Sequence, residues 1–215
     1  MVMDFDFTLL GEVPAPKSFM VRREFRGVGS FKLTVQRDAG GLLARDRVIY
    51  RPDRPEQGWI IHRVSRSGDT LTADGTPLKG LAKRRICLPP LITGGAYNQF
   101  GYDLFTGDAE SAYLHFAANN LTAPEDAARA IPRLVLDANL HRGPELPWQA
   151  RFERLSDLFE DIGAATEVGW DIRPDFGAKR YVFGAWAGVD RTTGTGRCAL
   201  SRELGNVEGG SVTED

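Results

Sequence analysis

Residues 31–36, Phe-Lys-Leu-Thr-Val-Gln, decide how the first part of the chain folds, because apolar and polar side chains alternate along them. A period of two is typical of a half-buried β-strand. The same alternation runs over residues 4–9. Gly27 and Gly29 lie between residues 31–36 and the preceding stretch at 19–25, and this spacing predicts a hairpin or a bulge.

More apolar stretches follow, and turn residues separate them. The stretches are 48–50, 58–62 and 71–73, with Pro52-Asp-Arg-Pro55 and Ser67-Gly-Asp69 between them. Strands joined by short turns at this spacing predict a meander that closes into a small barrel or sandwich.

Beyond residue 108 the apolar pattern changes to that of helices. Asp108 is a candidate N-cap for a helix whose apolar residues recur as far as Ala117. The other expected elements are a short helix at 124–129, an extended stretch at 133–136, a helix at about 147–166, and strands at 170–173, 179–186 and 198–200. The expected class is α+β, divided into a β-rich domain at 1–92, a mixed domain at 93–200 and a C-terminal segment at 201–215.

The net charge of −2 over 215 residues hides a gradient. Residues 1–92 carry 16 Lys and Arg against 10 Asp and Glu, a balance of +6, whereas residues 93–215 carry 11 against 19, a balance of −8. Opposite charge at the two ends suits head-to-tail contact between subunits. A sequence pI near 6.0 lacks the basic stripe that nucleic-acid binding needs.

No motif for catalysis, a cofactor or a metal is present in the sequence. His62, His115 and His141 are isolated, and neither a phosphate-binding glycine loop nor a Gly-x-Ser-x-Gly elbow occurs. Paired carboxylates are defined by distance in space, and Glu153 and Asp161 fall on the polar face of the helix expected at 147–166. We therefore predict no catalytic residue, no cofactor and no metal.

The cysteines and the N-terminus bear on the compartment. No apolar run approaches the roughly 18 residues of a membrane span, and the acidic N-terminus differs from a signal peptide. The protein is expected to fold where it is made. Cys87 and Cys198 are therefore expected to be reduced and buried.

Five residues are candidate interface positions. Arg84 and Arg85 belong to a short basic cluster at the edge of the expected barrel, and Asp190 and Arg191 lie in a late glycine-rich turn. Trp59 is a candidate aromatic anchor. Each also has an ordinary alternative: a solvated strand end for the arginines, a routine turn for Asp190, and the core for Trp59.

Several segments, taken in order, resemble the siphophage tail-tip hub family, whose members are also called tail-associated or prophage endopeptidase-tail proteins. The segments are 25–33, 48–50, 58–60, 81–86, 131–134, 152–159, 188–192 and 200–207. The resemblance spans residues 4 to 207. The chain departs from the family pattern by ending soon after residue 207, where relatives continue into a second barrel. It also has Leu200 before Ser201, at a position where relatives usually have an aromatic residue.

The resemblance implies a structural role. Such proteins resemble the baseplate hub of contractile phages, with a β-barrel of tail-tube type followed by a mixed domain. Three copies usually close a ring that contacts the distal tail protein, the tape-measure protein and other tail-tip proteins. DNA passes through the channel without specific binding, and the acidic part of this chain is expected to line that channel. The expected location is the virion tail tip, with the host cytoplasm during assembly.

Two other functions compete with this interpretation. A tail-tip cell-wall hydrolase, a peptidase or glycosidase, needs converging catalytic groups in a cleft. A carbohydrate- or receptor-binding module is suggested by the four tryptophans alone.

Overall fold

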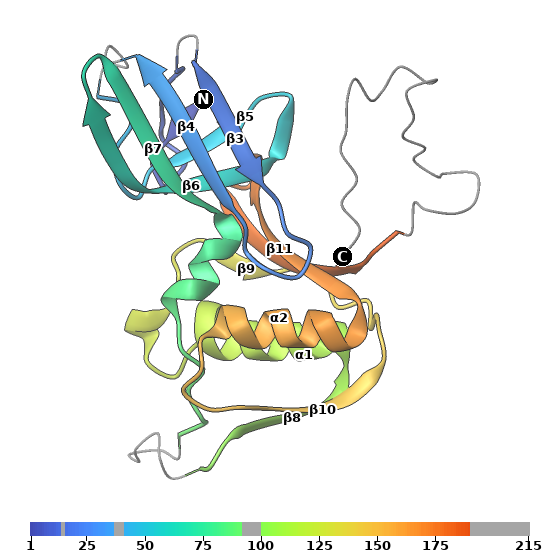
Figure 1. Ribbon diagram of the computed structural model, residues 1–215. Coiled ribbons are helices and arrows are strands. Elements are labelled where there is room, and N and C mark those ends of the chain that lie inside the picture. Colours follow the sequence, from blue (N-terminus) through green and yellow to red (C-terminus); the bar gives the residue numbers. More distant parts are fainter. Residues whose placement is uncertain (14–15, 37–40, 92–99, 190–215) are drawn as a thin grey trace, which may run out of the picture.

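A curled sheet packs on a layer of helices in the computed structural model, which describes residues 1–13, 16–36, 41–91 and 100–189 (Figure 1). All pairings in the seven-stranded sheet are antiparallel, in the order β2-β1-β5-β6-β7-β4-β3. The strands are β1 Val2–Met3, β2 Leu9–Gly11, β3 Ser18–Arg22, β4 Ser30–Gln36, β5 Val48–Arg51, β6 Arg54–Ser67 and β7 Thr70–Pro77.

The second layer combines helices with two small sheets. The sheets are a ribbon of β8 and β10, and a three-stranded sheet in the order β11-β12-β9. The elements are η1 Leu78–Arg84, β8 Asp103–Asp108, α1 Ala109–Ala117, η2 Ala118–Thr122, η3 Ala127–Arg129, β9 Leu134–Leu136, β10 Glu145–Ala150, α2 Leu155–Thr166, β11 Val168–Asp175 and β12 Arg180–Ala187. Strand β12 pairs antiparallel with β11 and parallel with β9.

Neighbouring residues of the curled sheet pack into two different apolar clusters. Val48 and Ile60 join the cluster that contains the helices, whereas Ile49, Trp59 and Ile61 join a second cluster of sheet residues. Successive side chains of a strand point to opposite faces, so both faces of the sheet are apolar here. This explains why β5 and the middle of β6 have continuous apolar runs in place of alternation.

Helix α1 begins at the residue that the sequence predicts. The carboxylate of Asp108 accepts a hydrogen bond of 2.8 Å from the backbone N–H of Ser111, which caps the helix. The buried ring of Tyr113 packs edge-on against Phe159 of α2, with 5.3 Å between the ring centroids. The Tyr113 hydroxyl donates to the carbonyls of Phe159 and Val168, so it fixes α1 to α2 and β11.

The helix expected at about 147–166 is shorter than predicted, because α2 begins at Leu155. Residues Glu145–Ala150 form β10 and pair with β8, with Trp148 opposite Phe105. A strand partner about 40 residues away therefore overrides the local pattern. Phe152 has a φ of 58° in the turn before α2. Its side chain is exposed, although the expected helix would have placed it on the buried face.

The strand expected over residues 4–9 is also wrong. Residues 4–8 form a turn, in which the N–H of Phe7 donates to the carbonyl of Asp4 at 3.0 Å. Phe5 and Phe7 both pack on Tyr181 of β12, with centroid distances of 4.5 and 4.7 Å. The alternation in this stretch therefore reflects two rings that reach the second layer from a turn.

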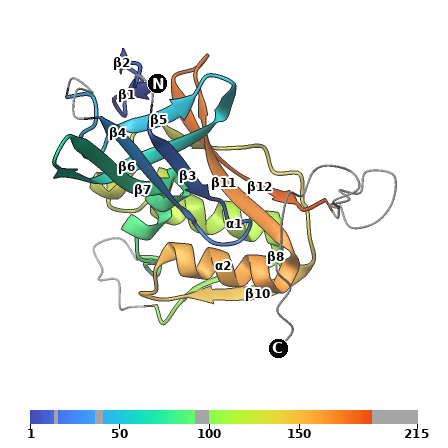
Figure 2. The same cartoon turned by 45° about the horizontal axis from the view of Figure 1, so that its top comes forward.

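The α+β class is confirmed, and so are the strands expected at 31–36, 48–50, 58–62, 71–73, 170–173 and 179–186. The extended stretch at 133–136 is β9, and the short helix at 124–129 is reduced to η3. The described strands make a curled sheet whose end strands, β2 and β3, do not pair with each other (Figure 2). A closed barrel of the hub type and the domain boundaries stay predictions, and the strand at 198–200 lies outside the described residues.

Candidate functional site

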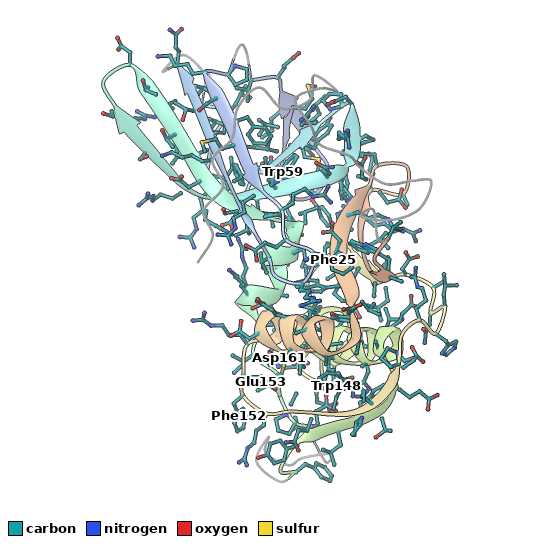
Figure 3. The ribbon with its side chains drawn as sticks, turned by 45° about the vertical axis from the view of Figure 1, so that its right-hand side comes forward. Phe25, Trp59, Trp148, Phe152, Glu153 and Asp161 are labelled. Carbon is teal, nitrogen blue, oxygen red and sulfur yellow. The ribbon has the colours of Figure 1, made fainter. Side chains whose placement is uncertain are left out.

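Trp59 lies inside the curled sheet, where 2% of its surface is exposed (Figure 3). Its ring meets Phe19 edge-on, with 5.1 Å between the ring centroids. Trp59 therefore packs the sheet in this protomer, and almost none of its surface is left for a partner.

Arg84 is at the end of η1, not at the end of a strand. Its guanidinium forms an ion pair of 2.7 Å with Asp46, and both side chains are partly exposed. It also lies 3.4 Å from Nδ1 of His62, whose pKa is lowered by burial and by Arg84. The Nε2 atom of His62 is 2.9 Å from the hydroxyl of Thr76. Arg84 is accessible, and its predicted interface role stays a prediction.

Arg85 has a different environment from its neighbour. Its Nε donates to the carbonyl of Arg129 at 2.9 Å, and Arg129 in return donates to the carbonyl of Ile86 at 2.8 Å. Burial lowers the pKa of Arg85. This exchange ties the segment after η1 to η3, so Arg85 serves the fold of its own chain.

The remaining predicted positions are placed as follows. Asp190, Arg191 and Cys198 lie outside the described residues. Cys87 is buried, as predicted, and burial raises the pKa of its thiol to about 12, which leaves it protonated.

Sequence reasoning missed the most constrained group, which is Lys79 of η1. Its side chain is 3% exposed, and its Nζ donates to the carbonyls of Glu24 and Phe25 at 3.0 and 3.1 Å. The same atom lies 4.4 Å from the centroid of the Trp170 ring, which is a cation–π contact. Burial lowers the pKa of Lys79 to about 8.

Lys79 and Trp170 fasten the β3–β4 loop, residues 23–29, to the helical layer. The indole of Trp170 donates to the carbonyl of Arg26 at 2.7 Å. The Phe25 ring covers Gly169 of β11 so closely that a Cβ there would clash with the ring, which favours glycine at this position. We call the contact of Lys79 and Trp170 with the β3–β4 loop the junction. A cavity of about 290 Å³ lies beside it, and Asp171 and Trp186 are among the residues that line this cavity.

A serine, a histidine and an aspartate meet at the start of α1. Nδ1 of His141 is 3.0 Å from Asp108 and 3.3 Å from Oγ of Ser111, and the Ser111 hydroxyl donates to Asp108 at 2.6 Å. In a hydrolase triad, the two ring nitrogens serve the carboxylate and the nucleophile separately. Here one nitrogen faces both. Burial raises the pKa of Asp108, but the hydrogen bonds from Ser111 and His141 outweigh it and keep the pKa below its usual value. The carboxylate therefore stays ionised, which suits its role as the cap of α1.

His115 also has a packing role. Its Nε2 is 2.8 Å from the buried Asp103, whose other oxygen accepts from Asn119 at 3.0 Å, and its ring stacks on Phe105. Within residues 1–13, 16–36, 41–91 and 100–189, no group of three or more His, Cys, Asp or Glu is arranged to hold a metal ion. In those same ranges, no helix is long and apolar enough to cross a membrane.

Comparisons with known proteins place this chain among phage proteins. The family described as "Siphovirus ReqiPepy6 Gp37-like protein" matches residues 1–214. The fold is similar to the crystal structure of prophage tail protein gp18 from Listeria monocytogenes EGD-e, with a TM-score of 0.51 and 11% identity, over 85% of this chain and 49% of that one.

A tail protein from Neisseria meningitidis MC58 matches with a TM-score of 0.44 and 17% identity, over 81% of this chain and 46% of that one. The chain thus spans about half the length of these two solved structures. No protein with a curated description matches it.

Proposed function

The chain belongs to the Siphovirus ReqiPepy6 Gp37-like protein family, and from this premise we propose that it is a siphophage tail protein and a subunit of the hub ring at the tail tip. Membership of a siphovirus family, together with a fold similar to that of a prophage tail protein, supports a structural role in the tail and a location in the virion. The proposal adds that the ring closes the tail tube and joins the distal tail protein, the tape-measure protein and the receptor-binding parts. The family match over residues 1–214 is the observation that carries it.

We also propose that the protein acts through protein–protein contacts and catalyses no reaction. The one Ser-His-Asp set among the described residues has the geometry of a helix cap, and the buried lysine donates to the chain's own carbonyls. Both groups are therefore held in structural contacts, which supports a structural subunit and not a hydrolase.

The proposed partners are further copies of this chain, in a trimer, together with the neighbouring tail-tip proteins. In that ring we place toward the channel those acidic side chains of residues 100–189 that lie outside the contacts between copies, because like charge lets DNA slide through without sticking.

Light scattering of the full chain, alone and mixed with its neighbouring tail proteins, tests the proposal. We expect defined complexes with those neighbours, including a species that contains three copies of this chain. A chain that binds none of them contradicts the hub role.

An assay on purified peptidoglycan separates the hydrolase alternative. We expect no release of soluble fragments. Release that Asp108→Asn abolishes would replace the structural interpretation with an enzymatic one, since Asp108 orients both Ser111 and His141.

A further inference from the structure

The ribbon of β8 and β10 exposes an aromatic surface on the side away from the helices. We call it the ribbon face, and it consists of Phe100, Tyr102, Leu104, Arg151 and Phe152. Leu104 is 68% exposed and Phe152 is 46% exposed. The guanidinium carbon of Arg151 lies 5.7 Å from the centroid of the Tyr102 ring and 5.3 Å from that of Phe152.

Strand alternation makes this exposure a fixed property of the fold. Phe105 and Trp148 face each other in the ribbon and pack toward the helices, so Leu104, opposite Gln149, must point outward. Exposed aromatic side chains around an arginine are the composition that binding hot spots favour.

Acidic groups of the α2 region border the ribbon face. Glu153 and Asp161 lie above Phe152 in Figure 3, and Asp157 is close to both. Burial and the charges of Asp161 and Asp157 raise the pKa of Glu153. Among the ion pairs of the described residues, none involves these three carboxylates. The surface therefore combines aromatic rings with the guanidinium of Arg151, and three carboxylates that form no ion pair with the described residues lie at its border.

The curled sheet offers a surface of complementary character on its end strand β3. We call it the β3 face, and it consists of Met20, Arg22 and Lys32, whose side chains lie on the opposite face of the sheet from Val21 and the buried Phe31. Met20 is 66% exposed and pairs across the strands with the exposed Lys32. These residues line an open groove of about 420 Å³. Asp74 also lines the groove, but it pairs with Arg63, and Arg22 pairs with Glu24. Among the ion pairs of the described residues none involves Lys32, so its ammonium is the uncompensated charge of this face.

We propose that the ribbon face of one copy binds the β3 face of the next copy, in a head-to-tail contact. The two faces match in chemistry, because each has an exposed apolar side chain, Leu104 or Met20, and their unpaired charges are opposite. Those charges are the three carboxylates beside the ribbon face and the ammonium of Lys32 on the β3 face. They also lie on different parts of the molecule, one on the curled sheet and one beyond the helices (Figure 1). A contact between two different faces generates a ring if the rotation closes and a filament if it does not. The contact is argued from the two faces alone, and the inference rests on the proposed function only where it places that contact in the phage tail.

Two charge variants test the contact by sedimentation velocity on the full chain. Met20→Glu places a carboxylate against the acidic border of the ribbon face, and Leu104→Lys places an ammonium against the basic side of the β3 face. Each variant alone is expected to weaken self-association by about tenfold or more. The equimolar mixture is expected to regain association, because it offers one contact between two unaltered faces and a Glu–Lys pair at the other.

Leu140→Lys is the matched control, since Leu140 is 63% exposed and belongs to neither face. It should associate like the wild type, and all three variants should keep the wild-type melting temperature because the positions are exposed.

Three results overturn the proposal: a wild-type chain that is monomeric at every concentration, a Met20→Glu variant that associates like the wild type, or a mixture that stays monomeric. The second indicates a symmetric contact through the ribbon face alone. None of the three removes binding to neighbouring tail proteins, so failure here is distinguishable from failure of the proposed function.

Discussion

The junction and the ribbon face use the same chemistry at opposite levels of exposure. At the junction, the buried ammonium of Lys79 lies over Trp170 and donates to two carbonyls of the β3–β4 loop. At the ribbon face, Arg151 lies between two exposed rings, Tyr102 and Phe152. The difference teaches that a cation–aromatic contact with fixed backbone partners holds the protomer together, whereas an exposed one remains open to another molecule.

Replacing Trp170 gives the largest expected loss of stability. Trp170→Ala removes a fully buried indole, its cation–π contact and its hydrogen bond to Arg26, and we expect a loss of about 3–5 kcal/mol in the free energy of unfolding. Urea denaturation measures it. Tyr102→Ala on the ribbon face is the matched aromatic variant and should change stability by less than about 1 kcal/mol. Equal losses would erase the distinction between the two regions.

Lys79→Met comes next, with an expected loss of about 1–3 kcal/mol near neutral pH, because two partly buried carbonyls lose their donor. The loss depends on pH. The folded pKa is about 8 against 10.5 for an ordinary lysine, so between these values the unfolded chain binds more protons and the wild-type protein gains stability as pH rises.

The methionine variant lacks this gain. Unfolding titrations near pH 7.5 and near pH 9.5 should therefore show the difference between the two proteins widening by about 2 kcal/mol. Parallel pH dependence would mean that the Lys79 ammonium is not desolvated in the folded protein.

Arg85→Ala is expected to cost about 1–2 kcal/mol, because the carbonyl of Arg129 loses a charged donor in a partly buried place. Thermal unfolding checks it, with Arg151→Ala as an exposed control that should have a smaller effect. A larger loss for Arg151 than for Arg85 would reverse the assignment of structural and accessible arginines.

Arg84→Glu is expected to have the smallest effect on stability, within about 1 kcal/mol, because its ion pair with Asp46 is partly exposed. If Arg84 contacts a partner, the variant weakens ring assembly while the fold stays intact. Light scattering and thermal unfolding measured together separate the two effects. Loss of folding would show that the Arg84–Asp46 ion pair is needed to hold η1 against the sheet.

Local patterns predicted much of this fold, and long-range contacts account for what they missed. The alternation at 31–36 and the cap at Asp108 depend on neighbours in sequence, and both are confirmed. Strand β10 depends on pairing with β8, so its residues could not be told from the start of a helix.

The same reasoning separates the candidate site residues. Arg84 and Arg85 are adjacent in sequence, yet their surroundings come from Asp46 in one case and Arg129 in the other. Lys79 sits in Pro-Leu-Lys-Gly and has partners more than 50 residues away, so no motif could identify it. The resemblance to a siphophage family did not depend on these contacts, and membership of a siphovirus protein family is confirmed.

A cryo-electron microscopy reconstruction of the intact tail that carries this chain tests the central claim most directly. We expect the chain at the tip in several copies, with Leu104 of each copy covered by the strand that bears Met20 of its neighbour. A tail in which the chain is absent, or in which both surfaces of every copy face solvent, would contradict a protein that works by docking.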